Sequence, residues 1–125
     1  MKNTNTKLCE AASQLIFSCS GAADVGSIAD LTARQLTKEG FGKMFCIVGI
    51  GGQAEPILTA TQKASSLLAI DGCPLDCAKK TLEKAGFSNV THIRVTDLGM
   101  EKGKTLINDA NISVVRNKAQ SVLGG

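Results

Sequence analysis

Four cysteines stand at regular positions in the sequence, and their thiols are the side chains with the richest chemistry. Cys19, Cys46 and Cys73 are separated by intervals of 27 residues, and Cys77 follows four residues after the last of them. Cysteine thiolates bind zinc and other soft metals, and they also act as nucleophiles and redox groups. The spacing therefore indicates either a thiolate metal site or thiol chemistry.

The cysteine count favours these chemistries over disulfide bonding. The chain has five cysteines, and an odd number cannot be fully paired. In a reducing compartment, a set of this size more often signals metal binding or redox chemistry than structural disulfides. The fifth residue, Cys9, precedes the first expected strand and is expected to be a free thiol outside the site.

The interval of 27 residues matches one strand followed by one helix of a parallel α/β fold. Each of the three evenly spaced cysteines would then fall at the carboxyl end of its strand. Three neighbouring strands would deliver three sulfurs to one edge of the sheet, which is where open α/β folds bind their ligands. Cys77 would join them from the first turn of the next helix.

Apolar runs and helix signals alternate along the chain, which predicts strands and helices in alternation. The expected strands are Leu15–Cys19, Lys43–Val48, Ser66–Ile70 and Thr91–Thr96, and the expected helices run from Asp24 to about Glu39, from about Glu55 to Lys63, from Pro74 to Ala85 and from about Ile112 to Leu123. This order predicts an α/β fold with an open, mostly parallel, Rossmann-like sheet of about four strands and helices on both faces. We expect a single domain over residues 1–125, with residues 1–13 as a flexible N-terminal segment.

The segment Asp71-Gly72-Cys73-Pro74-Leu75-Asp76-Cys77 carries the strongest local signal. A proline at a helix start places Cys73 at the N-cap and Cys77 in the first full turn, so that both thiols face the same way. The helix N-terminus would favour thiolates, and Gly72 would let the backbone turn sharply. The alternative is a pair of small apolar residues packed under a helix start.

The remaining candidates differ in how well they are placed. Cys19 ends the first expected strand and can join the pair at positions 73 and 77. Cys46 is either buried in the middle of the second strand or, if that strand ends early, at the same edge. Four thiolates would make a closed structural zinc site, whereas three would leave a position for a substrate or water. His92, at the start of the fourth strand, is expected at the far edge as a surface or core histidine.

Charge and hydropathy argue against several classes of partner. The net charge is only +3, and there is no Trp or Tyr to stack on bases, so we expect no nucleic-acid partner. No apolar run approaches the roughly 20 residues that span a bilayer, and the first residues lack the apolar core of a signal peptide. We therefore expect no membrane association and a cytoplasmic location, with a metal ion as the expected partner.

Several motifs together resemble the DGC-domain family, which is named for its Asp-Gly-Cys motif. The likeness extends from Leu15 to Lys102, and its motifs are Cys19–Ala22, Cys46–Gly51, Asp71–Cys73, Cys77 and Val95–Gly99. The family is described as binding zinc through cysteines, and no reaction is attached to it. The resemblance implies zinc as the cofactor and Cys19, Cys46, Cys73 and Cys77 as its ligands.

The leading hypothesis is a zinc-binding protein in which Asp71 and Asp24 orient loops around the metal and Gly72 shapes the turn. The alternative is a thiol redox or nucleophilic-cysteine enzyme, in which Cys73 attacks and Cys77 or Cys19 resolves the intermediate. A third hypothesis is a ligand- or partner-binding module that uses the glycine-rich segment 49–52, with zinc only fixing the loop geometry.

Overall fold

The sheet at the centre of the fold is parallel throughout. A computed structural model describes residues 14–123, so the expected flexible segment 1–13 and Cys9 lie outside the described residues. The strands form one sheet in the order β2-β1-β3-β4, with every neighbouring pair parallel. They span Gln14–Ser18 (β1), Lys43–Met44 (β2), Ser66–Asp71 (β3) and Val90–Arg94 (β4). The predicted open, parallel α/β architecture is confirmed.

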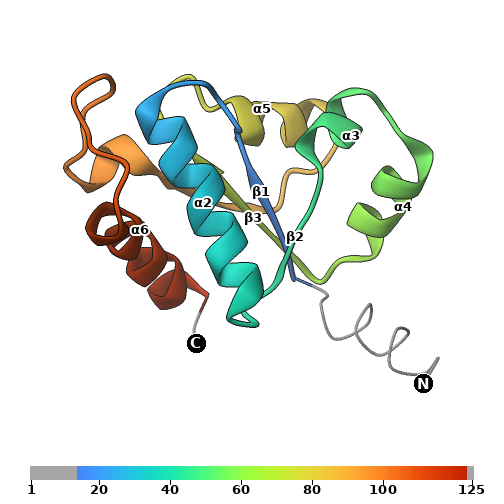
Figure 1. Cartoon of the computed structure of the whole chain (residues 1–125). Helices are drawn as coiled ribbons and strands as arrows, with labels where there is room; N and C mark the ends of the chain where they lie inside the picture. The colour runs from blue at the N-terminus through green and yellow to red at the C-terminus, as the bar shows by residue number, and fades with distance from the viewer. Residues whose placement is uncertain (1–13, 124–125) are drawn as a thin grey trace.

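Helices cover both faces of this sheet (Figure 1). Within residues 14–123 they are α2 (Asp24–Lys38), α3 (Ile47–Gly51), α4 (Glu55–Lys63), α5 (Cys77–Lys84), α6 (Asp109–Val122) and the short 3-10 helix η1 (Val95–Leu98). Side chains of α2 and α6 pack on one face, and those of α3, α4 and α5 pack on the other. In this range no helix combines the length and the apolar character needed to span a lipid bilayer.

Alternation along β3 decides which way its last residue points. Leu68 and Ile70 belong to the core under α2 and α6, whereas Leu67 and Ala69 belong to the core under α5. Successive side chains of a strand point to opposite faces, so Asp71 continues the second set. The last residue of β3 is therefore a buried carboxylate on the face that α5 covers.

The second strand is shorter than predicted, because the apolar run at its end forms a helix. The predicted strand covered Lys43–Val48, but β2 ends at Met44 and α3 begins at Ile47. The Cys46 sulfur accepts a hydrogen bond from the Gly49 N–H at 3.3 Å, and Ile50 is buried in the core on this face. This packing overrides the strand preference of the run. Cys46 therefore lies past the strand end rather than in its middle.

The helix after β3 begins later than predicted, and Pro74 lies in a turn. The Asp76 N–H donates to the Cys73 carbonyl at 3.1 Å, which puts Pro74 at its favoured second position of a four-residue turn. Asp76 then takes a left-handed φ of 54°, and α5 begins at Cys77. Cys73 is therefore not the N-cap residue, and the prediction that Cys73 and Cys77 share a helix face is wrong.

Three backbone segments cross in close contact at the carboxyl edge of the sheet. A Cβ on Gly72 would lie 2.6 Å from the Gly26 nitrogen and 2.7 Å from the Val25 carbonyl carbon. A Cβ on Gly26 would in turn lie 3.1 Å from the Gly21 carbonyl oxygen. The loop after β1, the start of α2 and the loop after β3 therefore meet with no side chain between them, which only glycine permits.

Gly72→Ala is expected to destabilise the fold, because the backbone atoms that the new methyl group would strike cannot rotate away. We expect a loss of about 1–3 kcal/mol, the usual cost of overpacking, in urea unfolding followed by circular dichroism. Gly51→Ala is the matched control, since a Cβ there meets only the Thr81 methyl group at 3.7 Å. Equal unfolding midpoints for the two variants would contradict the close crossing.

Candidate functional site

A pocket of about 340 Å³ opens at the carboxyl edge of the sheet, between the loops that follow β1 and β3. The strand order places β2 on one side of β1 and β3 on the other, so the connection after β1 runs toward one edge of the sheet and the connection after β3 runs toward the other. Such topological switch points are where open α/β sheets bind ligands. Its walls include three of the four predicted thiols, those of Cys19, Cys73 and Cys77.

These three thiols are free and come from different segments of the fold. Cys19 follows β1 and packs against both cores, while Cys73 lies in the turn after β3 and is half-buried. Cys77 is the first residue of α5 and is exposed. Within residues 14–123 the cysteines form no disulfide, and no three of their sulfurs lie within 4.8 Å of one another. The pocket thus gathers the thiols without bringing three sulfurs into mutual contact.

The fourth predicted thiol lies apart from this pocket. Cys46 is exposed, and its sulfur accepts the Gly49 N–H at the start of α3. A second hollow of about 320 Å³ lies between α3 and α5, and Cys19 and Cys77 line it together with α3 residues such as Val48. Cys46 is on the same edge of the sheet but lines neither hollow. Its role as a ligand stays a prediction.

The aspartate of the Asp-Gly-Cys segment is buried and holds the start of α5. Asp71 is 1% exposed, and its Oδ1 and Oδ2 accept the N–H groups of Ala78 at 2.7 Å and Lys79 at 3.1 Å. These are the amides that an N-cap side chain normally binds, whereas the N-cap residue Asp76 makes no such bond. Asp71 thus caps α5 from the neighbouring strand and fixes Cys77 as the first residue of the helix.

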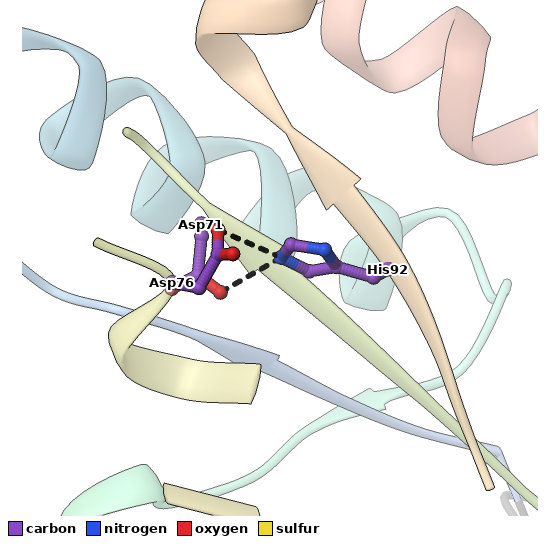
Figure 2. Close-up of side chains that lie close together, drawn as sticks. All are labelled: Asp71, Asp76 and His92. Carbon is purple, nitrogen blue, oxygen red and sulfur yellow. Dashed lines mark hydrogen bonds and ion pairs between the residues drawn. The ribbon is translucent and has the colours of Figure 1, made fainter. Parts of the chain in front are cut away.

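Two residues of β4 hold the loop between β3 and α5, and Figure 2 shows the first of them, His92, beside Asp71 and Asp76. His92 Nε2 lies 2.9 Å from Asp71 Oδ2 and 3.6 Å from Asp76 Oδ1. An ionised carboxylate only accepts hydrogen bonds, so Nε2 carries the proton. Arg94 donates to both carboxylate oxygens of Asp76, at 2.9 and 2.7 Å, and this pairing holds the pKa of Asp76 below its usual range.

Asp71, Asp76 and His92 are close enough to be considered as a metal site, but their bonds favour a structural role. One ligand atom from each lies within 4.8 Å of the others. Both Asp71 oxygens already accept backbone amides, and both Asp76 oxygens are bound to Arg94. A cation would have to displace Arg94 or lie beside its positive charge. We therefore interpret this group as the base on which the thiol-bearing turn rests.

A loop between η1 and α6 lies beside the start of α2 and is fastened there by Asp24 (Figure 1). Asp24 Oδ1 accepts the Gly103 N–H and Oδ2 accepts the Thr105 N–H, each at 2.9 Å, and these bonds hold the Asp24 pKa below its usual range. We call residues 101–105 the strap. The strap carries Lys102, whose Nζ lies 3.6 Å from Cys73 Sγ, so a positive charge stands beside a pocket thiol.

The charged partners of the site, His92, Arg94 and Lys102, were not predicted as site residues. His92 was expected at the far edge of the sheet, which is wrong: it pairs with Ala69 in the middle of β4, and its side chain reaches Asp71. A usable signal was present, because His92 and Arg94 alternate along a strand and so point to one face. Lys102 gave no such signal, because its position depends on the fold of the strap.

Comparison with known proteins identifies the family of this chain. The DGC domain matches residues 15–120. The chain belongs to the DGC domain family. A DGC relative from Pseudomonas aeruginosa, the anaerobic and virulence modulator AnvM, is 31% identical over 88 residues, which cover 70% of this chain and 67% of that protein. No solved structure gives a significant match.

Asp71→Asn is expected to lower the free energy of unfolding, because an amide cannot accept from all three of the donors around this buried group. We expect a loss of about 1.5–3 kcal/mol in urea unfolding, the range for hydrogen bonds to a charged group. Asp109→Asn is the matched control: it also removes an aspartate charge from a helix start, but α6 is capped by Asn108 instead. A wild-type midpoint for Asp71→Asn would contradict the capping role.

The strap is expected to loosen in acid, at a pH below the ordinary aspartate range. Because folding lowers the Asp24 pKa, its bonds stabilise the fold above the ordinary value of 3.8 and are lost as the pH falls through the lower, folded value. The NMR amide shifts of Gly103 and Thr105 should titrate with a midpoint below 3.8. The Phe45 amide, which lies outside the strap and donates to the Ile16 carbonyl, is the internal control. A midpoint at or above the ordinary value would be incompatible with these bonds.

Proposed function

We propose that this DGC protein binds zinc with the thiolates of its carboxyl-edge pocket. The observation that carries the proposal is that Cys19, Cys73 and Cys77 line one pocket although they come from three separate segments. Their freedom from disulfides supports it, as does the position of the Asp-Gly-Cys segment at the same pocket. Cys46, just beyond β2 on the same edge, is the candidate for a fourth thiolate.

The donor set is suited to zinc rather than to a hard cation. Thiolate sulfur is a characteristic zinc ligand, whereas magnesium and calcium take oxygen, and the nearby carboxylate oxygens are already hydrogen-bonded. Sulfurs around a tetrahedral zinc lie about 3.8 Å apart, so binding requires the pocket thiols to approach one another. Zinc would crosslink the thiol-bearing segments and, with an open position, would act as a Lewis acid.

The protein's own residues would hold this site in place and balance its charge. Asp71 and Asp76 anchor the two ends of the turn that carries Cys73. Asp71 binds the first amides of α5, and Asp76 binds Arg94 of β4. Three thiolates around Zn²⁺ leave one net negative charge. Lys102 would offset that charge, because its ammonium group lies within hydrogen-bonding distance of the Cys73 sulfur.

A second candidate is thiol redox chemistry, and the contact between Lys102 and Cys73 favours it. An ammonium group 3.6 Å from the sulfur stabilises the negative charge of an attacking thiolate. The Cys73 thiolate would attack one sulfur of a small disulfide and release one thiol, and Cys77 or Cys19 would then displace the other. The two protein thiols would lose two electrons as they form a disulfide, and the substrate would leave as two thiols.

Metal content separates these two candidates. Elemental mass spectrometry of the purified chain is expected to give about one zinc per chain, with the pocket thiols shielded from thiol reagents until a chelator is added. Cys73→Ser should lose the zinc and melt at a lower temperature, because it removes a donor from the pocket. Cys46→Ser tests the candidate fourth thiolate outside the pocket and should keep more zinc than Cys73→Ser does.

The outcomes are distinct. A chain that takes up no zinc from added zinc salt, and whose thiols react as fast as in denaturant, would reject the metal proposal. Reversible formation of a disulfide at Cys73 in that metal-free chain would then support the redox candidate. Zinc loss in Cys46→Ser as complete as in Cys73→Ser would make Cys46 the fourth ligand.

A further inference from the structure

The thiol pocket is larger and more apolar than a bound metal ion requires. Its volume of about 340 Å³ lies within the range of about 300–1,000 Å³ that is typical of small-molecule sites. Apart from the thiols, much of its wall consists of small or aliphatic residues, including Ala22, Ala23 and Val25. Leu75 also lines the pocket and is 61% exposed, so it offers an apolar contact at the rim. Space for an organic molecule therefore remains beside the sulfurs.

The charges around the pocket leave one cation available. The carboxylates of Asp71 and Asp76 line the pocket, but backbone amides and the side chains of β4 already bind them. Lys102 lines the pocket too, and in the described part of the chain it forms no ion pair with a carboxylate. The hydrogen bond recorded for its ammonium group goes to the Cys73 sulfur. Such a lysine is free to bind an anion.

The backbone on both sides of Lys102 is held in place. Asp24 binds the N–H groups of Gly103 and Thr105, and the Thr105 hydroxyl donates to the Glu101 carbonyl at 2.7 Å. Gly103 has a left-handed φ of 88°, which lets the strap turn sharply at this point. The strap therefore presents Lys102 to the pocket by specific bonds, although the side chain itself is exposed.

We propose that the pocket binds a small organic anion, a carboxylate-bearing molecule whose charge meets Lys102 and whose remainder lies against the apolar wall and the thiols. The inference deepens the proposed function and rests on it for the choice of pocket, because a ligand held here would reach the sulfur of Cys73. It does not depend on the metal, since the fold itself positions Lys102 and the apolar wall.

The probes are iodoacetate and iodoacetamide, which alkylate the same thiols and have similar sizes but differ by one negative charge. Mass spectrometry after partial alkylation of the chelator-treated protein gives the ratio of the two rates at each cysteine. Cys46, which is exposed and outside the pocket, is the reference within the same molecule. We expect the iodoacetate-to-iodoacetamide ratio to be about fivefold higher at Cys73 than at Cys46, the effect of one exposed ion pair, and to decline with added salt.

Two lysine variants show whether the preference comes from Lys102. Lys102→Gln is expected to bring the ratio at Cys73 down to that at Cys46. Lys104→Gln is the matched control, because it removes the same charge from the same strap, but Lys104 pairs with Glu101 at 3.7 Å. That variant should leave the ratio unchanged. Equal ratios at Cys73 and Cys46 in the wild type, or a Cys73 preference that survives Lys102→Gln, would overturn the proposal.

These results are separable from those of the zinc test. A charge preference at Cys73 in a chain that binds no zinc would support the anion site and reject the metal proposal. A chain that binds zinc but shows no charge preference at Cys73 would reject the anion site alone. If the metal-free chain unfolds, the test uses the purified chain instead. Its melting temperature is measured in the presence of malonate and, separately, of the neutral analogue malonamide. A rise with malonate alone that Lys102→Gln removes supports the proposal, and the absence of such a rise rejects it.

Discussion

The buried carboxylate of Asp71 is the constraint on which the rest of the site depends. A buried charge is costly unless hydrogen bonds surround it, and here two amides of α5 and the ring of His92 supply them. This requirement joins the end of β3, the first turn of α5 and the middle of β4. Because Asp71 caps the helix, Asp76 is left to take its left-handed conformation and to bind Arg94. The turn that carries Cys73 is thereby fixed at both ends.

The site consists of a rigid base and more exposed functional groups above it. The base is made by the carboxylate network and by the glycine contact between Gly72 and Gly26, neither of which leaves room for adjustment. Cys77 and Lys102 are exposed, and Cys73 is half-buried in its turn. The proposed zinc site would need a firmly held backbone and thiols that are free enough to approach one another. The division between base and functional groups meets both needs.

The parts of this arrangement that depend on local patterns could be predicted from the sequence. The even cysteine interval placed Cys19, Cys46 and Cys73 after successive strands, and the strand order confirms that these strands are neighbours. Errors arose where tertiary contacts override local preference. The run after Cys46 becomes α3 because Ile50 is buried there, and Pro74 lies in a turn because the helix is capped from β3. The family match is confirmed, whereas the ligand set and the metal stay predictions.

The alternation of His92 and Arg94 indicates that they share one face of a strand, but the groups that the charged partners contact could not be predicted, because those contacts depend on long-range geometry. His92 and Arg94 meet the aspartates only in one register of β4 against β3, and a shift of one residue would turn both side chains to the opposite face. Lys102 depends on bonds that join Asp24 to a strap 79 residues further along the chain. Nothing in the residues around either position encodes these distances.

Because β2 is short, one side of the site is bordered by the small helix α3. Only Leu15 and Ile16 of β1 pair with β2, and soon after Met44 the chain forms α3, which packs against α5. Within α3 the buried residue is Ile50, and segments with few buried contacts are the first to unfold locally. Release of α3 would leave the ladder between β1 and β3 intact while it removes one wall of the second hollow and uncovers Cys19, which is half-buried in the folded chain. Cys19 would then gain a second route to solvent, governed by local unfolding and independent of the strap.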